Sequence, residues 1–312
     1  MSLLVVGSVA FDAIETPFGK RDRIIGGAAT YITLASSYFA KPVNLVSVVG
    51  GDFPKEDIQM LQRHGANTTG LQVKEDQKSF FWSGRYHNDM NSRDTLETQL
   101  NVLGEFDPIV PEAFQDCNYL MLGNLSPDVQ RLVLERLRNR PKLVVMDTMN
   151  FWMQIAMDSL RKTISMVDVL TVNDEEARQL SGEYSLLKAA RAILKMGPKY
   201  LVIKKGEHGA LLFHGEGEDI FYAPALPLEE VFDPTGAGDS FAGGFIGYLA
   251  STGDISFANM RNAVIVGSAL ASFTVERFGP ERLVDLKRND LAERIKSFRR
   301  ITHFDLELSM NG

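Results

Sequence analysis

The chain has 312 residues, of which 45% are hydrophobic and 23% charged, a composition typical of a globular protein with one sizeable core. Its formal net charge of −7 argues against broad binding to nucleic acid or to an anionic membrane, since both require a clustered basic surface. The single cysteine, Cys117, excludes an intrachain disulfide and a cysteine-based metal cluster.

Short apolar runs alternate with helical patterns along most of the chain. The N-terminal run is too short to cross a bilayer and lacks a basic start and a cleavage site, so we expect a cytoplasmic protein. Runs that stop at Gly, Asp or Asn predict buried parallel strands at 3–7, 43–50, 119–123, 142–147, 167–173 and 200–206. Helices are expected between them at 28–40, 54–64, 127–138, 174–181 and 186–196. The alternation predicts an open, mostly parallel α/β sheet with helices on both faces.

Ligands of such a sheet bind outside the carboxyl ends of its strands. The residues that end the predicted strands should therefore line the site: Gly7, Gly50, Gly123, Asp147, Asn173 and Gly206. Asn124 and Asp147 are pocket-lining candidates to which the sequence assigns no further role.

Two regions interrupt the alternation, at 11–25 and at 74–102. Both mix aromatic, charged and turn-forming residues, and the second alternates in part as an antiparallel strand does. We expect one small β lid, inserted into a single domain over 1–312. The alternative is a pair of surface loops, although long unstructured insertions are uncommon in compact domains.

The stretch FDPTGAGDSFAGGFIGYLA at 232–250 places two glycines and an acid ahead of an apolar helix. The backbone amides of Gly236, Ala237 and Gly238 can point at one spot, to which the helix adds the positive end of its dipole. Asp239, at the mouth of this anion hole, is placed to accept a proton from a hydroxyl that attacks a phosphoryl group, and nearby positive charge should keep it ionised. The alternative is a helix cap whose glycines allow close packing.

Other catalytic motifs are missing from the sequence. It contains no G-x-x-x-x-G-K-[ST] P-loop, no G-x-S-x-G elbow and no pair of histidines at metal-ligand spacing. The sequence therefore gives no indication of acyl transfer or of hydrolysis at a protein-bound metal.

Five segments together resemble the PfkB, or ribokinase-like, carbohydrate kinases. DPTGAGDSFAGGFI at 233–246 is similar to the C-terminal signature of that family, and VGSVAFD is similar to its first strand, which ends at a substrate-binding acid, here Asp12. GGAATYITLA at 26–35 resembles the double-glycine substrate loop, NDEE at 173–176 the N-x-x-E motif, and KKGEHGALL at 204–212 the nucleotide-side strand and turn. The five occur in the family's order and cover nearly the whole chain.

The resemblance implies a ribokinase-like fold and ATP-dependent phosphorylation of a hydroxyl on a sugar or sugar-like acceptor. Asp239 would be the general base and the backbone of 236–238 the anion hole. One alternative is a nucleoside kinase of the same fold, and another, from a different class, is a non-catalytic nucleotide-binding regulatory protein. The intact GAGD and N-x-x-E segments favour an enzyme.

The resemblance also implies which residues contact each ligand. The substrate contacts would be Asp12, Gly26, Gly27 and Thr30. The nucleotide contacts would be Lys204, Gly206, Gly209 and Ser268, although Ser268 could equally belong to a buried helix. Mg²⁺ would be organised, through its waters, by Asn173 and Glu176, for which a polar helix start is the alternative. Some relatives bind K⁺ at a site that corresponds here to Asp233, Thr235 and Gly279.

Two features leave the acceptor open. The family usually carries Asn shortly after the double glycine, whereas this chain has Thr30 or Tyr31 there. In the lid, Trp82 and Tyr86 are candidates for packing on a ligand and Arg85 for facing phosphate, but the three could instead form a lid-to-lid homodimer contact. Closure of the lid would exclude water that competes as acceptor.

Overall fold

Two β-sheets organise the structure, a computed structural model that describes residues 1–215, 218–303 and 305. The larger sheet has nine strands in the order β13-β12-β11-β10-β9-β8-β1-β4-β5. Their bounds are β1 (Leu3–Val6), β4 (Val43–Gly50), β5 (Ala66–Lys74), β8 (Tyr119–Leu122), β9 (Leu143–Asp147), β10 (Val169–Asn173), β11 (Tyr200–Lys204), β12 (Ala210–His214) and β13 (Asp219–Ala223). Neighbouring strands are parallel except at β11-β12 and β12-β13, which are antiparallel. The six predicted strands and the mostly parallel sheet are confirmed.

The central strands are apolar throughout because both faces of the sheet are covered. In β1, Leu3 and Val5 pack into one core, while Leu4 and Val6 pack into the other, and all four are fully buried. Because successive side chains of a strand point to opposite faces of the sheet, this short strand contributes to both cores.

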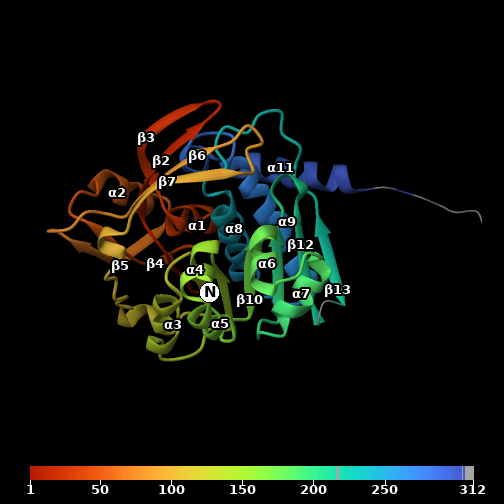
Figure 1. Ribbon diagram of the computed structural model, residues 1–312, viewed down its shortest axis with the longest axis horizontal. Coiled ribbons are helices and arrows are strands. Elements are labelled where there is room, and N and C mark those ends of the chain that lie inside the picture. Colours follow the sequence, from red (N-terminus) through yellow and green to blue (C-terminus); the bar gives the residue numbers. More distant parts are fainter. Residues whose placement is uncertain (216–217, 304, 306–312) are drawn as a thin grey trace, which may run out of the picture.

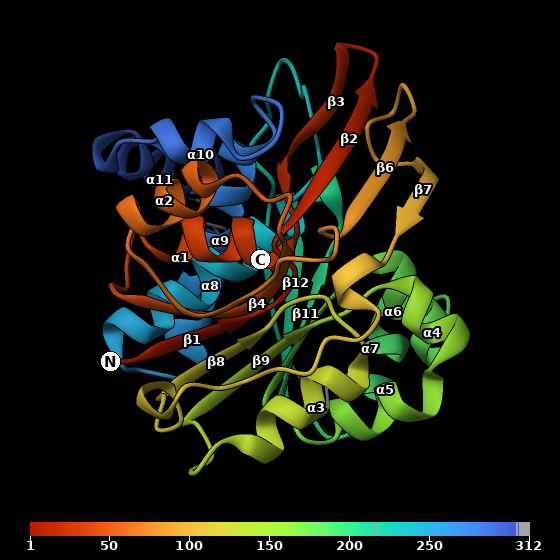
Figure 2. The same ribbon diagram turned by 90° about the vertical axis from the view of Figure 1, so that its left-hand side faces the viewer.

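Helices cover both faces of the large sheet, as predicted (Figure 2). One face carries α1 (Ala28–Ser36), α2 (Lys55–Arg63), α8 (Ala237–Thr252), α9 (Phe257–Thr274), α10 (Glu281–Asp285) and α11 (Arg288–Thr302). The other carries α3 (Pro127–Arg136), α4 (Asn150–Ile155), α5 (Met157–Ile164), α6 (Asp174–Ser181) and α7 (Leu186–Leu194). Short 3₁₀ turns lie at Asn101–Leu103, Glu112–Phe114 and Gly206–His208. No helix in the described ranges is long and apolar enough to cross a membrane.

The smaller sheet is the predicted lid. It has the order β3-β2-β6-β7, with β2 (Ala10–Thr16), β3 (Gly19–Gly26), β6 (Phe81–Tyr86) and β7 (Arg93–Gln99). It rises from the carboxyl edge of the large sheet, away from the helical layers (Figures 1 and 2). The alternative of two surface loops is therefore wrong.

Strand register decides which lid side chains face the large sheet. Asp12 on β2 is paired with Trp82 on β6, and Tyr86 on β6 is paired with Arg93 on β7. Because paired residues point to the same side of a sheet, and residues two apart share that side, these four side chains lie on one face, which we call the inner face of the lid.

Candidate active site

The site is centred on the first turn of α8, below the lid. The residue before the helix, Gly236, has the left-handed φ of 76°, and a Cβ there would lie 2.4 Å from ring carbons of Tyr31. Both the conformation and the close contact require glycine at this position. The turn thereby directs the start of a 16-residue helix, with its positive dipole end, at the carboxyl edge of the sheet.

The amides available at this turn differ by one residue from those predicted. The amide of Ala237 donates to the carbonyl of Pro234 at 3.1 Å and so closes the turn itself. The amides of Gly236, Gly238 and Asp239 have no acceptor within the described part of the chain. The amides free to bind an anion at this turn are therefore those of residues 236, 238 and 239, because the bond within the turn occupies the amide of Ala237.

Asp239 lies in the first turn of α8, where burial dominates its electrostatics. Burial and the charge of Asp147 raise its pKa to about 7, against the opposing effect of Lys204 and Arg93. Lys204 and Arg93 are the nearby positive charges that were expected to favour the ionised carboxylate, and the loss of solvation opposes them. A pKa near neutrality matches what a general base needs at neutral pH.

A buried ion pair lies beside the first turn of α8. The Lys204 ammonium, at the end of β11, lies 2.9 and 3.1 Å from the two carboxylate oxygens of Asp147, at the end of β9. A Cβ on Gly238 would lie 3.1 Å from the same ammonium nitrogen. The strand ends thus bring a cation to the place where phosphoryl charge would be held.

Asn173 and Glu176 form a reciprocal cap at the start of α6. The Glu176 amide donates to Asn173 Oδ1 and the Asn173 amide donates to Glu176 Oε2, both at 2.7 Å. This is the polar helix start that was the alternative to a metal role. Burial raises the pKa of Glu176 to about 7, and its Oε1 stands outside the cap.

The donor set at this edge suits magnesium held through water. Among the described residues, no three or more His, Cys, Asp or Glu side chains are grouped as a direct metal cage. The charge of Asp147 nevertheless acts on both Glu176 and Asp239, and all three residues supply the carboxylate oxygens that Mg²⁺ prefers. An ion that keeps several of its waters does not need a cage.

On the lid side, Asp12 and the double glycine lie together as predicted. Asp12 is buried and accepts a hydrogen bond from the amide of Gly27. A Cβ on Gly26 would lie 1.9 Å from Asp12 Oδ2, and Gly27 has a φ of 86° with the carbonyl of Ser8 close by, so both positions require glycine. Burial, together with the charges of Asp233 and Asp239, raises the pKa of Asp12 to about 7.

Thr30 differs from its predicted role. Its side chain is fully buried, and its hydroxyl donates to the carbonyl of Gly26 at 2.6 Å. The single hydroxyl proton is therefore used within the chain, because Thr30 lies one helical turn after the double glycine.

The inner face of the lid carries aromatic rings and one cation. The six-membered ring of Trp82 lies over Gly84, where a Cβ would be 2.2 Å from it. Tyr86 is buried and accepts a hydrogen bond from Thr235, in the turn before α8, at 3.2 Å. Arg93 is paired with Tyr86 on the inner face of the lid, and its charge opposes the rise in the pKa values of Asp12, Glu176 and Asp239.

The sequence pointed to the wrong lid arginine. Arg85 lies on the opposite face of β6 from Tyr86, and its Nε pairs with Glu15 Oε1 at 2.9 Å. Arg93 carries no motif, and only its position opposite Tyr86 in the hairpin could have identified it. A lid-to-lid homodimer stays a prediction.

The nucleotide-side turn touches the tip of the lid. Gly206 has a φ of 55°, and a Cβ there would lie 2.5 Å from Asn91 Oδ1 of the β6–β7 loop. The side-chain amide of Asn91 donates to Glu207 Oε1 at 3.2 Å. Gly209 is equally confined, since a Cβ would lie 2.1 Å from the carbonyl of Ala223, and Ser268 is buried on α9.

Asp233 holds the predicted K⁺ residues together. Its Oδ1 accepts from the amide of Thr235 at 2.9 Å and its Oδ2 accepts from the amide of Gly279 at 2.8 Å. These two bonds account for the grouping of the three residues, and the K⁺ site stays a prediction.

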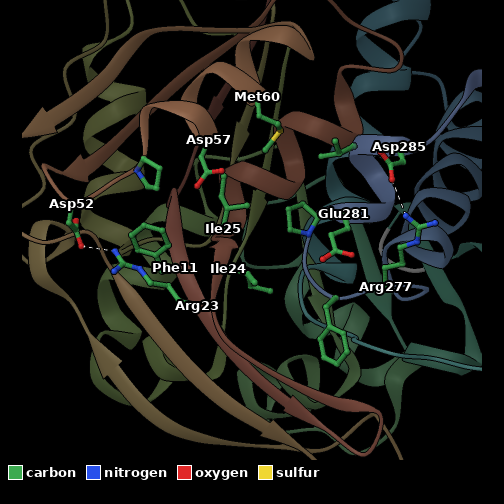
Figure 3. A pocket seen from close by; sticks show the side chains of 14 residues that line it. Phe11, Arg23, Ile24, Ile25, Asp52, Asp57, Met60, Arg277, Glu281 and Asp285 are labelled. Carbon is green, nitrogen blue, oxygen red and sulfur yellow. Dashed lines mark hydrogen bonds and ion pairs between the residues drawn. The ribbon is translucent and has the colours of Figure 1, made fainter.

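A separate pocket of about 730 Å³ lies beside β3, between α2 and α10 (Figure 3). It includes Phe11 but not Asp12, its neighbour on β2, and it contains none of the predicted site residues. Two of its charged pairs are Arg23 with Asp52 at 3.0 Å and Arg277 with Asp285 at 2.9 Å. It does not belong to the candidate active site.

Comparisons with known proteins point to one group. The sequence model described as pfkB family carbohydrate kinase matches residues 2–285. A cytidine kinase of Thermococcus kodakarensis is 32% identical over 252 residues, which are 79% of this chain and 87% of that protein. A nucleoside kinase of Methanothermobacter thermautotrophicus is 25% identical over an alignment of 326 residues, covering 95% of each chain. The crystal structure of Methanocaldococcus jannaschii nucleoside kinase matches with a TM-score of 0.75 at 20% identity, over 95% of this chain and 99% of that one.

Proposed function

The chain belongs to the pfkB family of carbohydrate kinases, and on that premise we propose that it transfers the γ-phosphate of ATP to a hydroxyl group of a nucleoside. That it is a kinase was predicted and is confirmed, and family membership implies the use of ATP and Mg²⁺. Of the two acceptors predicted for the enzyme, the relatives that act on cytidine and other nucleosides favour the second.

The observation that carries the nucleoside acceptor is the position of Trp82 relative to Asp12. The two residues are paired across β2 and β6 on the inner face of the lid. A carboxylate that accepts hydrogen bonds from sugar hydroxyls thus stands beside a flat indole whose ring rests on Gly84. A nucleoside has both matching parts, a polyol and a flat base that stacks on aromatic rings, whereas a simple sugar has only the first.

In the proposed reaction, Asp239 accepts the proton of the attacking hydroxyl. Phosphoryl transfer leaves the protein mainly the tasks of positioning and charge stabilisation. The amides of Gly236, Gly238 and Asp239 stabilise charge on the transferring phosphoryl group. The Lys204 ammonium, next to Gly238, and the Arg93 guanidinium above the site add positive charge from the sheet and from the lid.

The metal would be held through water by Asn173 and Glu176, with Asp147 as a further oxygen donor. When bound, Mg²⁺ neutralises phosphate charge and orients the phosphates. The cap between Asn173 and Glu176 fixes the glutamate side chain, so that its free Oε1 keeps one direction.

The nucleotide and the acceptor are assigned to two neighbouring parts of the site. We assign the nucleotide to the neighbourhood of Lys204, Gly206, Gly209 and Ser268, and the acceptor to that of Asp12, Gly26 and Gly27. The contact between Asn91 and Glu207 supports lid closure over the nucleotide side as well as over the acceptor.

An acceptor panel tests the proposal. Thermal shift in the presence of ADP and Mg²⁺ should show stabilisation by at least one of cytidine, adenosine, inosine, guanosine and uridine, because a ligand that binds only the native state raises its stability. A coupled assay of ADP release should then show turnover with the same nucleoside. Turnover with ribose or a hexose but with none of the five nucleosides would refute the nucleoside acceptor.

A further inference from the structure

A glutamine of α3 ties together two strand ends at the edge of the large sheet that carries the site. Gln130 is fully buried, and its Nε2 donates to the carbonyl oxygen of Gly123 at 2.9 Å and to that of Asp147 at 3.0 Å. The carbonyl oxygen of Leu122 lies farther away, at 3.4 Å. Because a primary amide has two N–H groups, the two shorter bonds use both of them.

The oxygen of the same side chain has no partner. Oε1 of Gln130 is buried and makes no hydrogen bond within the described part of the chain. Such an oxygen loses its bonds to water and gains none, which destabilises the native state, and an apolar side chain of similar size would avoid this cost. We therefore look for the role of Gln130 in what its nitrogen holds.

Gln130 bridges β8 and β9 just beyond the point where their pairing stops. The last pair of these two strands is Leu122 with Met146. Gly123 and Asp147 are the next residues along, and the Gln130 amide bonds to the carbonyl groups of both. The helix thus fixes the spacing of the two strand ends at the site.

The direction of the Asp147 carboxylate depends on the backbone that Gln130 holds. Its Oδ1 accepts a hydrogen bond from the next amide in the chain, that of Thr148, at 3.0 Å. The Lys204 ammonium bonds to both oxygens of this carboxylate and lies beside Gly238. A shift of the end of β9 would therefore move the carboxylate, and the ammonium with it.

We propose that Gln130 is a positioning residue for phosphoryl transfer, because it holds the end of β9 where Asp147 keeps the Lys204 ammonium beside the first turn of α8. Gln130 contacts neither the acceptor nor the nucleotide and acts through Asp147. Stabilisation of phosphoryl charge requires a cation that is in place before the reaction, and a misplacement of about 1 Å can cost about 100-fold in rate. The inference rests on the proposed function for the role of Lys204, but it holds for a nucleoside and for a sugar acceptor alike.

A double-mutant cycle of Gln130→Met and Asp147→Asn tests the inference. Methionine is similar to glutamine in length but has no donor, and asparagine lacks the charge that holds the ammonium. The control is Gln72→Met, since the Gln72 side chain also donates to a backbone carbonyl, that of Asp107 at 2.9 Å, but belongs to the edge strand β5. The measured quantities are kcat and the KM for whichever nucleoside or sugar the wild type phosphorylates, and melting temperatures show that each variant is folded.

Loss of the donor should lower kcat only while Asp147 can hold the ammonium. Gln130→Met alone should lower kcat by about 10-fold and leave the KM for the acceptor within about 2-fold of the wild-type value. When Asp147→Asn is already present, Gln130→Met should lower kcat further by no more than about 2-fold. Gln72→Met should leave both quantities within about 2-fold of the wild-type values.

A second variant keeps the test possible if Gln130→Met does not fold. Gln130→Glu has nearly the size of the wild-type side chain and loses at least one of the two donor hydrogens whether the carboxyl group is protonated or ionised. The same cycle with Asp147→Asn should then give the same pattern of kcat values.

The possible failures of the inference and of the proposed function differ. If the substitution of Gln130 lowers kcat equally with and without Asp147→Asn, or does not lower it, Gln130 does not act through Asp147, and the proposed function stands. A raised KM for the acceptor with a normal kcat would also overturn the inference, since it would assign the effect to Gly123. If the wild type phosphorylates neither nucleosides nor sugars, the proposed function fails and the inference fails with it.

Discussion

Replacement of Asp239 by Asn removes the proposed general base while nearly preserving the size of the side chain. Because the carboxamide cannot accept the hydroxyl proton, we expect kcat to fall by about 100-fold or more. Binding of ATP should be largely unchanged, since the proposed nucleotide contacts lie elsewhere. A coupled assay gives kcat, and calorimetry with a non-hydrolysable ATP analogue gives the affinity.

The same substitution should stabilise the protein at high pH. The pKa of Asp239 is raised from 3.8 to about 7, so the native state binds this proton more tightly than the unfolded chain does. The stability associated with the group is therefore greatest below pH 4, declines as the pH rises through about 7, and is constant above that value. The pKa of Asp239 differs by about three between the native and unfolded states, and each pKa unit corresponds to about 1.4 kcal/mol, so the free energy of unfolding can change by at most about 4 kcal/mol. Because Asp239 is partly exposed to solvent, we expect Asp239→Asn to raise the free energy of unfolding at pH 8 by about 2 kcal/mol.

Urea unfolding at pH 8 and at pH 4 measures this gain. The difference between Asp239→Asn and the wild type should be largest at pH 8 and close to zero at pH 4. Glu229→Gln, at an exposed position in the loop before α8, is the control and should change stability little at either pH. A variant less stable than the wild type at pH 8 would refute the argument from burial, and near-normal turnover would remove Asp239 from its role as base.

Three further substitutions test other parts of the site. Arg93→Met should lower kcat/KM by about 10–100-fold, because it removes a cation from above the carboxylates. In the control Arg85→Met, on the outer face, kcat/KM should stay within about 2-fold of the wild-type value. Equal effects of the two substitutions would contradict the inner position of Arg93. Glu176→Gln can keep the cap at the start of α6 but loses a negative charge, so half-maximal activity should require about 10-fold more Mg²⁺. An unchanged dependence of activity on the Mg²⁺ concentration would count against the metal role. Gly26→Ala should raise KM for the acceptor by about 10-fold or more, because the added Cβ would displace the Asp12 carboxylate. The control is Gly104→Ala, whose Cβ would meet nothing nearer than 3.4 Å and which should behave as the wild type. A normal KM for Gly26→Ala would show that Asp12 does not bind the acceptor.

The sequence predicts the centre of the large sheet better than its edges. Strands buried on both faces are continuous apolar runs, and six of these were located from the sequence alone. β5, β12 and β13 were not among these six. β5 and β13 lie at the two edges, where partly exposed strands such as Ala66–Lys74 contain polar residues and lack a continuous apolar run.

At the site, the sequence identifies residues that belong to motifs and misses those that depend on register. Asp12, Gly26 and Gly27 were recognised from local patterns, and the structure brings them together. Arg93 enters the site only because β6 and β7 pair Tyr86 with it, and no local pattern encodes that pairing. The same register turns Arg85 to the outer face.

The division of labour between the two sheets has a consequence for engineering. Asp12 and Trp82 belong to two inserted segments, β2–β3 and β6–β7, whereas Asp239 and Lys204 belong to the scaffold below. Each segment leaves the scaffold and returns to it as a hairpin. Exchange of these two hairpins for those of another kinase of this fold is therefore a direct route to retargeting the enzyme, since it replaces the parts proposed to select the acceptor and retains the groups proposed to perform the transfer.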